Sequence, residues 1–157
     1  MNIDQYQSTT PGRRLGLKGK EKKKFCGETL FYDHGTGYIY ICHQVSLNAG
    51  ETVQSKEGFE QVMGDVGRRV KSYHTDNAPF QSKTFRESLQ LENQSITFSG
   101  VGAHHQNGAT ERAIKSITWW ARTMILHAII MWPEQANTEL WLMAMDQAVF
   151  IWNNLSR

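Results

Sequence analysis

The clearest pattern along the chain is a pair of short runs rich in aromatic and β-branched residues. These runs cover residues 28–34 (ETLFYDH) and 38–45 (YIYICHQV), and residues 35–37 (Gly-Thr-Gly) separate them. Such side chains are typical of strands, and a short glycine-containing connection is typical of a hairpin. The pattern therefore predicts an antiparallel hairpin.

The rest of the chain predicts alternating strands and helices. A short strand over residues 1–7 is expected to end at the turn-forming sequence Ser-Thr-Thr-Pro-Gly. Further strands are predicted near residues 71–76 and 95–100. Helical spacing of apolar residues predicts four helices, over residues 51–70, 82–91, 109–127 and 138–154. This order predicts an α/β fold, with a mixed sheet and helices on both of its faces.

Two of the predicted helices have a well-defined apolar side. In the helix over residues 51–70 this side is formed by Phe59, Val62, Met63, Val66 and Val70. In the helix over residues 109–127, a polar stripe and an apolar side face in opposite directions. The stripe is Glu111, Lys115, Thr118 and Arg122, and the apolar side is Ala113, Ile117, Ala121, Met124 and Ala128.

Composition is that of one globular domain. The chain has 157 residues, of which 39% are hydrophobic and 20% charged. Its longest apolar stretch, residues 124–132, contains His127 and is followed by Pro133, so no membrane-spanning segment is expected, and no signal peptide is visible. Cys26 and Cys42 form neither a disulfide framework nor a zinc-ligand pair, and we expect free thiols. The chain starts within a strand, as a piece of a longer protein would.

Charge is distributed unevenly, although the net charge is only +2. Residues 13–24 (RRLGLKGKEKKK) hold seven of the 17 basic residues and one of the 15 acidic residues. The remainder carries a net charge of −4. A basic arm on an acidic body suits a protein that binds phosphates at one place and cations at another. A solvated loop explains the same arm.

Three carboxylates stand out, each with an ordinary alternative. Asp4 lies within a strand, where burial of an unpaired carboxylate is costly. Asp76 ends an apolar strand, where open sheets place ligands, or it caps the helix that follows. Glu111 lies in the first turn of its helix, where an acid also stabilises the helix dipole and pairs with Lys115. Together they resemble a site for Mg²⁺ and phosphoryl transfer.

Several sequence segments resemble the catalytic core of retroviral and retrotransposon integrases. DNAPF, from Asp76, is similar to the motif after their second catalytic aspartate, and HHQNGATERAIKSI resembles the segment that carries their catalytic glutamate. IDQYQSTTPG with FYDHGTGYIYI resembles the opening of copia-type retrotransposon integrases, and LWLMAMDQAVFIWN resembles their last helix. The resemblance covers essentially the whole chain, as a single domain over residues 1–157.

The resemblance implies a ribonuclease H-like fold with five strands, the first and fourth side by side. It implies that Asp4, Asp76 and Glu111 bind Mg²⁺ or Mn²⁺, as two ions, and catalyse cutting and joining of DNA. Asp33, the competing acid, is expected to be structural or secondary to that site. Gln106, Asn107, Lys115 and Arg122 are expected to contact DNA. A homo-oligomer and a nuclear location are implied as well.

The spacing of the carboxylates departs slightly from the family pattern, and other interpretations of the chain stay open. Thirty-four residues separate Asp76 from Glu111, one fewer than the commonest spacing in the family. A nuclease or transposase could use the same carboxylates, and a degenerate or domesticated domain could bind DNA or a partner without catalysis. The helix around Trp141 to Trp152 is a candidate oligomer interface, although core packing explains it equally well. Trp119 and Trp120 favour core or interface positions over base stacking.

Overall fold

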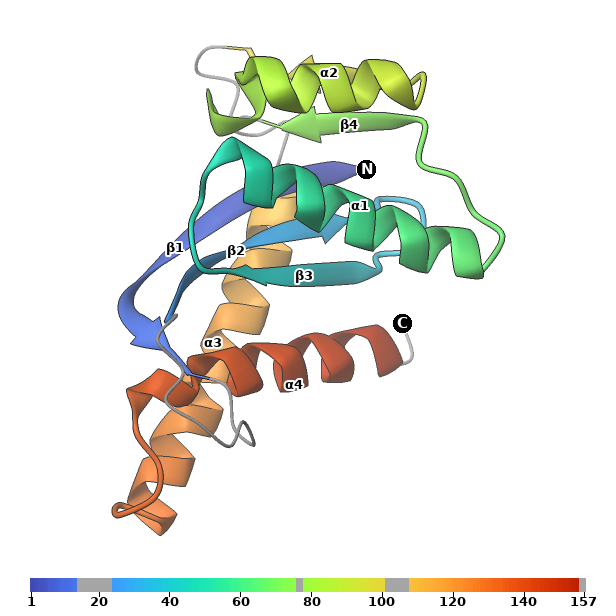
Figure 1. The fold of residues 1–157 in the computed structure, drawn as a ribbon. Helices are drawn as coiled ribbons and strands as arrows, with labels where there is room; N and C mark the ends of the chain where they lie inside the picture. Colours follow the sequence, from blue (N-terminus) through green and yellow to red (C-terminus); the bar gives the residue numbers. More distant parts are fainter. Residues whose placement is uncertain (14–23, 76–77, 101–107, 156–157) are drawn as a thin grey trace.

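The structure is a computed structural model that describes residues 1–13, 24–75, 78–100 and 108–155. A five-stranded sheet runs through its centre in the order β3-β2-β1-β4-β5 (Figure 1). β1 pairs antiparallel with β2 and parallel with β4, β2 pairs antiparallel with β3, and β4 pairs parallel with β5. The predicted hairpin and the mixed sheet are confirmed. The strands are β1 (Asn2–Gly12), β2 (Phe25–Tyr32), β3 (Ile39–Gln44), β4 (Ser72–Thr75) and β5 (Ser95–Phe98).

Helices cover both faces of this sheet. α1 (Ala49–Asp65) and α2 (Lys83–Leu91) pack on one face, and α3 (Gly108–Met131) and α4 (Trp141–Asn154) pack on the other (Figure 1). Two short 3₁₀ helices, η1 (Ala78–Gln81) and η3 (Thr138–Leu140), precede α2 and α4. None of the helices in the described ranges is long and apolar enough to cross a membrane.

Each face has its own hydrophobic core, because successive strand residues point to opposite sides. Leu30 belongs to the core under α3 and α4, and the next residue, Phe31, belongs to the core under α1 and α2. In the second core, the ring of Phe31 stacks on Phe59 of α1 with centroids 4.5 Å apart. The sheet is therefore the common wall of two cores.

β1 is longer than the sequence predicts. The Ser-Thr-Thr-Pro-Gly segment does not end the strand, which continues to Gly12 through an irregularity in its pairing with β2 between Gln7 and Gly12. Inside the irregularity, the hydroxyl of Ser8 donates to the carbonyl oxygen of Thr10 over 2.8 Å. Turn-forming residues here produce a bulge instead of a chain reversal.

α1 is shorter than predicted. It ends at Asp65, and Gly67 then adopts a left-handed conformation with φ of 69°. Of the expected apolar side, Phe59 is fully buried, whereas Val66 is 64% exposed. Val70 is buried, but it lies beyond the helix. The glycines near residue 65 therefore outweigh the apolar periodicity.

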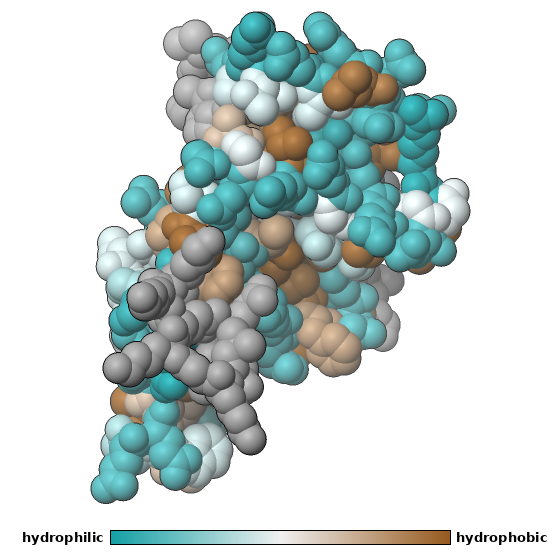
Figure 2. Space-filling view, in the orientation of Figure 1, coloured by the Kyte–Doolittle hydropathy of each residue, from teal (hydrophilic) through white to brown (hydrophobic). Residues whose placement is uncertain are grey.

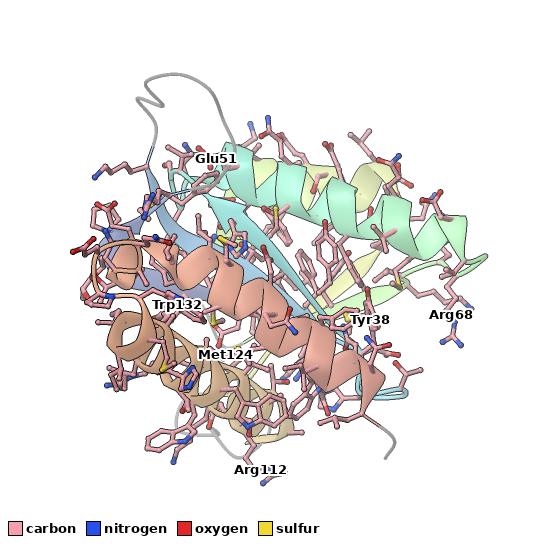
Figure 3. The ribbon with its side chains drawn as sticks, turned by 90° about the horizontal axis from the view of Figure 1, so that it is seen from below. Tyr38, Glu51, Arg68, Arg112, Met124 and Trp132 are labelled. Atoms are coloured by element: carbon pink, nitrogen blue, oxygen red, sulfur yellow. The ribbon has the colours of Figure 1, made fainter. Side chains whose placement is uncertain are left out.

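α3 agrees with its predicted pattern. Ala113, Ile117 and Ala121 are almost completely buried, and Met124 packs against the same core on the side toward α4 (Figure 3). The helix extends to Met131, four residues beyond the expected end, and stops just before Pro133. α2 begins after Ser82, whose hydroxyl accepts a hydrogen bond from the backbone N–H of Phe85.

Candidate functional site

Asp4 lies near the start of β1, the central strand, on the face that α3 covers. Its neighbour Ile3 is buried in the opposite core, so the alternation of β1 turns Asp4 toward α3. With Leu30 of β2 and Ile114 of α3, Asp4 lines a cavity of about 70 Å³. Its Oδ1 accepts a hydrogen bond of 2.7 Å from the backbone N–H of Gln5. The carboxylate is half-buried and held by its own strand.

Glu111 is tied to the same strand through its neighbour. In a buried contact, the side-chain amide of Asn2 donates to the hydroxyl of Thr110 over 2.8 Å. Asn2 is two residues before Asp4, on the same face of β1, and Thr110 directly precedes Glu111 in the first turn of α3. The carboxylate of Glu111 itself is exposed. The start of α3 is therefore fixed over the part of β1 that carries Asp4.

The third predicted ligand, Asp76, lies outside the described residues. β4, which directly precedes it in the chain, pairs in parallel with β1 in the register Asn2 to His74. The backbone N–H of His74 donates to the carbonyl oxygen of Met1 over 2.8 Å. The predicted adjacency of the first and fourth strands is confirmed.

The described ranges contain no group of three His, Cys, Asp or Glu side chains close enough to hold a metal ion. Two of the three predicted ligands, Asp4 and Glu111, belong to those ranges. Carboxylate oxygens are the donors that Mg²⁺ and Mn²⁺ prefer, so the chemistry of this donor set fits either cation. The sequence expectation of a two-ion site stays a prediction.

Of the four residues predicted to contact DNA, two lie in the described ranges and two lie outside them. Lys115 and Arg122 are exposed on α3, on the side of the helix that carries Glu111. Arg112 points away from the body of the molecule from the same helix (Figure 3). Gln106 and Asn107 lie outside the described residues. α3 thus presents cationic side chains beside an acidic one.

A polar cluster on the same face of the sheet, which leads from the core to the surface, was not predicted from the sequence. Glu28 and His43 are paired directly across β2 and β3, and Glu28 Oε2 lies 3.2 Å from His43 Nδ1. His43 Nε2 lies 2.8 Å from Asp146 Oδ1 on α4. Burial lowers the pKa of His43, but Asp146 and Glu28 outweigh burial and raise this pKa to about 9. Only the strand register could have revealed this cluster.

Asp33, the competing acid, lies away from Asp4. It occupies the turn between β2 and β3, where its Oδ2 accepts a hydrogen bond of 2.7 Å from the hydroxyl of Thr36. These turn hydrogen bonds outweigh the effect of burial and keep the pKa of Asp33 below its ordinary value. The position agrees with a structural role.

A cavity of about 520 Å³ lies near Asp33, between the end of α1, the β2–β3 turn and the end of α4. Tyr38 lies between the two helices and Arg68 at the outer end of α1 (Figure 3). The surface seen in Figure 2 is mostly hydrophilic over α1 and α2, and apolar side chains gather below α1. This cavity is separate from the one that Asp4 lines.

The tryptophans of α4 serve mainly the core. Trp141 is buried, and its indole N–H donates to the carbonyl oxygen of Thr10 over 2.9 Å. Trp152 packs against Trp120 of α3, with ring centroids 5.9 Å apart. The structure therefore accounts for both rings without an oligomer interface.

By sequence, no protein-family model and no curated protein matches this chain. Solved structures do match it by shape. The catalytic core domain of HTLV-2 integrase in complex with magnesium, in its trimeric form, is 18% identical with a TM-score of 0.64, over 99% of this chain and 84% of that chain. Its dimeric form is 18% identical with a TM-score of 0.62, over 99% and 86%.

A chain of the simian T-cell lymphotropic virus intasome, solved in complex with PP2A regulatory subunit B56 gamma, is also similar. It is 15% identical with a TM-score of 0.68, over 99% of this chain and 48% of that chain. Together with the strand order and the helices on both faces, these similarities establish the fold. It is the α/β, ribonuclease H-like fold of retroviral integrase catalytic cores.

Proposed function

We propose that this chain is the catalytic core of a retrotransposon integrase of the copia type, a metal-dependent polynucleotidyl transferase. It processes 3′ DNA ends and joins them to target DNA. The observation that carries the proposal is the buried hydrogen bond between Asn2 and Thr110. This contact fixes the helix start that bears Glu111 against the strand that bears Asp4.

Asp76 completes the proposed site. β1 and β4 are parallel and register Asn2 with His74. In the sequence, Asp4 follows Asn2 by two residues, and Asp76 follows His74 by two residues. The triad is therefore Asp4, Asp76 and Glu111, with Mg²⁺ or Mn²⁺, as two ions, as the cofactor. When bound, the cations supply charge stabilisation at the reacting phosphate. Asp4 lies on β1 and Glu111 on α3, and a rigid framework of this kind would position the cations.

The proposed substrate is DNA, and the residues in contact with it are Gln106, Asn107, Lys115 and Arg122. Lys115 and Arg122 are exposed on the same side of α3 as Glu111, where long cationic side chains can bind phosphates near the reacting bond. The structural neighbours are described as dimeric and trimeric integrase cores and as an intasome, which supports action as a homo-oligomer. The proposed location is the nucleus.

The test is a disintegration assay with Mn²⁺ on a branched DNA, in which the parent chain is compared with Glu111→Gln. We expect joined product from the parent and at least a hundredfold less from the variant, because removal of one carboxylate that stabilises the transition state costs several kcal/mol. Glu57→Gln is the matched control. Glu57 is an exposed acid on α1, on the opposite face of the sheet, and its substitution is expected to leave the product yield unchanged.

The competing function is a degenerate or domesticated domain that binds DNA without catalysis. It predicts no product from the parent and no thermal stabilisation by Mn²⁺ in either chain. A cation that binds only the folded state must raise the melting temperature by mass action. Equal product from the parent and from Glu111→Gln would reject the proposed site.

A further inference from the structure

Two neighbouring tryptophans on α3 have opposite environments. Trp120 packs against Trp152 and belongs to the core beneath α4. Trp119 is 67% exposed on the outer surface of the helix. An indole carries a large apolar area, and its exposure is unfavourable unless a partner covers it. Core packing therefore explains Trp120 and leaves Trp119 without a role.

Cations surround Trp119 on the helix surface. Lys115 lies one turn before it and Arg122 three residues after it, so both side chains are its neighbours on the outer face. Both are exposed. In the sequence of α3, Glu111 is the only acid, and no acid follows it up to Met131. An exposed aromatic ring between cations is the combination by which proteins bind single-stranded nucleic acids.

Trp119 is also close to the proposed site. It follows Glu111 by eight residues, which is about 12 Å along the helix axis and about 80° around it. Nucleotides in an extended strand are spaced several ångströms apart, so a strand whose phosphate lies at Glu111 extends over Trp119 within a few nucleotides. The ring is thus within reach of the bases next to a DNA end.

We propose that the Trp119 indole is a stacking platform for an unpaired base at a DNA end, with Lys115 and Arg122 on the neighbouring phosphates. This rests on the proposed function and adds a binding subsite to it. A base inside an intact duplex has both faces covered, so the platform distinguishes a DNA end with a single-stranded overhang from a blunt end. Stacking tolerates any base, because every base presents a π-face.

Two more apolar residues, Leu126 and Ile130, are exposed on the same side of α3 as Trp119, closer to the end of the helix. Their exposed fractions are 59% and 76%. They lie beyond Arg122, where the helix surface is apolar instead of cationic. Their composition suits a protein partner, and that of the surface around Trp119 suits a nucleic acid. Because of this difference, we assign Trp119 to DNA binding. The alternative is a protein that docks on Trp119, Leu126 and Ile130 together, and the experiment must reject it.

The experiment measures binding of fluorescein-labelled hairpin DNA by fluorescence anisotropy in EDTA. One probe has a blunt end and the other a five-nucleotide 5′ overhang. We expect the parent to bind the overhang probe about tenfold more tightly than the blunt probe, because stacking of one base on an aromatic ring strengthens binding by about this factor. Trp119→Ala and Trp119→Leu remove this preference, and Trp119→Phe retains most of it, because only an aromatic ring stacks. Leu126→Ala, an exposed apolar residue beyond the cations, is the matched control and keeps the preference.

Three results would overturn the platform: no preference of the parent for the overhang probe, an equal loss on both probes in Trp119→Ala, or full retention of the preference in Trp119→Leu. A change of oligomeric state in Trp119→Ala, measured by light scattering, together with unchanged DNA binding, would assign the ring to a protein interface. Because the measurement needs neither cation nor chemistry, it is repeated in the Glu111→Gln chain. Glu111→Gln is expected to keep the preference. If the parent prefers the overhang probe but gives no product in the disintegration assay, the proposed function is rejected and the platform is kept.

Discussion

One polar cluster lies on each face of the sheet, and the two clusters differ in how their charged groups are paired. On the face under α1, the carboxylate of Glu60 accepts from Lys56 Nζ at 3.1 Å, from the hydroxyl of Tyr73 at 2.6 Å and from Gln94 Nε2 at 2.5 Å. Lys56 is only 1% exposed. Burial, and then the neighbouring Glu60, raise the pKa of Tyr73 above its ordinary value. The carboxylate of Glu60 therefore accepts hydrogen bonds from donors in three segments of the chain.

On the other face, Glu28, His43 and Asp146 form an open series. Glu28 is 1% exposed and Asp146 is 62% exposed, so the series leads from the core to solvent. Glu28 Oε2 and His43 Nδ1 lie 3.2 Å apart without a well-aligned hydrogen bond. The second cluster depends on a proton on His43, whereas no histidine takes part in the first. The second cluster is therefore expected to make the stability of the chain depend on pH.

The strongest test of the first cluster is Glu60→Ala. The substitution leaves a buried ammonium group and a buried hydroxyl without their acceptor, and we expect a loss of about 3–5 kcal/mol in the free energy of unfolding. Urea titration at pH 7 measures it. Glu57→Ala, an exposed acid on the same helix, should change stability by less than about 0.5 kcal/mol. A similar small effect of both substitutions would show that the cluster contributes little.

The second cluster predicts a loss of stability as pH rises. The pKa of His43 in the folded chain is about 9, above its ordinary value of 6.5, so folding favours the protonated ring. The stabilisation is complete below pH 6.5 and is lost as pH rises through 9, by up to about 3 kcal/mol. The free energy of unfolding of the parent, measured between pH 6 and 9.5, should fall relative to that of His43→Gln. Parallel curves for the two chains would contradict the assignment.

The smallest expected effect is that of Asp146→Asn. Solvent screens this exposed carboxylate, so its removal should cost less than about 1 kcal/mol at pH 7. The pKa of His43 should nevertheless move down from about 9 and stay above 6.5, since Glu28 remains in place. An NMR titration of the His43 ring measures this shift. An unchanged pKa would show that Glu28 alone holds the proton.

Part of the fold could be predicted because local sequence decides it. The periodicity of α3 correctly assigns Ala113, Ile117 and Ala121 to the core, and the aromatic runs correctly predict the β2–β3 hairpin. The end of α1 and the length of β1 were predicted wrongly. In both segments, apolar spacing and turn-forming residues gave conflicting signals, and tertiary packing decided between them.

The polar contacts were less predictable, because they depend on register and burial. Lys56 and Glu60 have the i, i+4 spacing of an ordinary surface pair, but Lys56 is buried. Glu28 and His43 are 15 residues apart and meet only because the hairpin pairs them. For the candidate site, motifs supplied Asp4 and Glu111, but the contact between Asn2 and Thr110 gave no sequence signal.

The hydrogen bond between Asn2 and Thr110 also has a consequence for synthesis of the chain. Its two partners are separated by 108 positions, and a ribosome adds about 5–20 residues per second. The first strand therefore leaves the ribosome roughly 5–20 s before the helix that closes over it. β2, β3 and β4 all follow β1 and precede α3 in the chain, so both neighbours of β1 in the sheet are synthesised within this interval. The strand that bears Asp4 therefore waits for the helix that bears Glu111, and the proposed site forms only after the sheet strands have been synthesised.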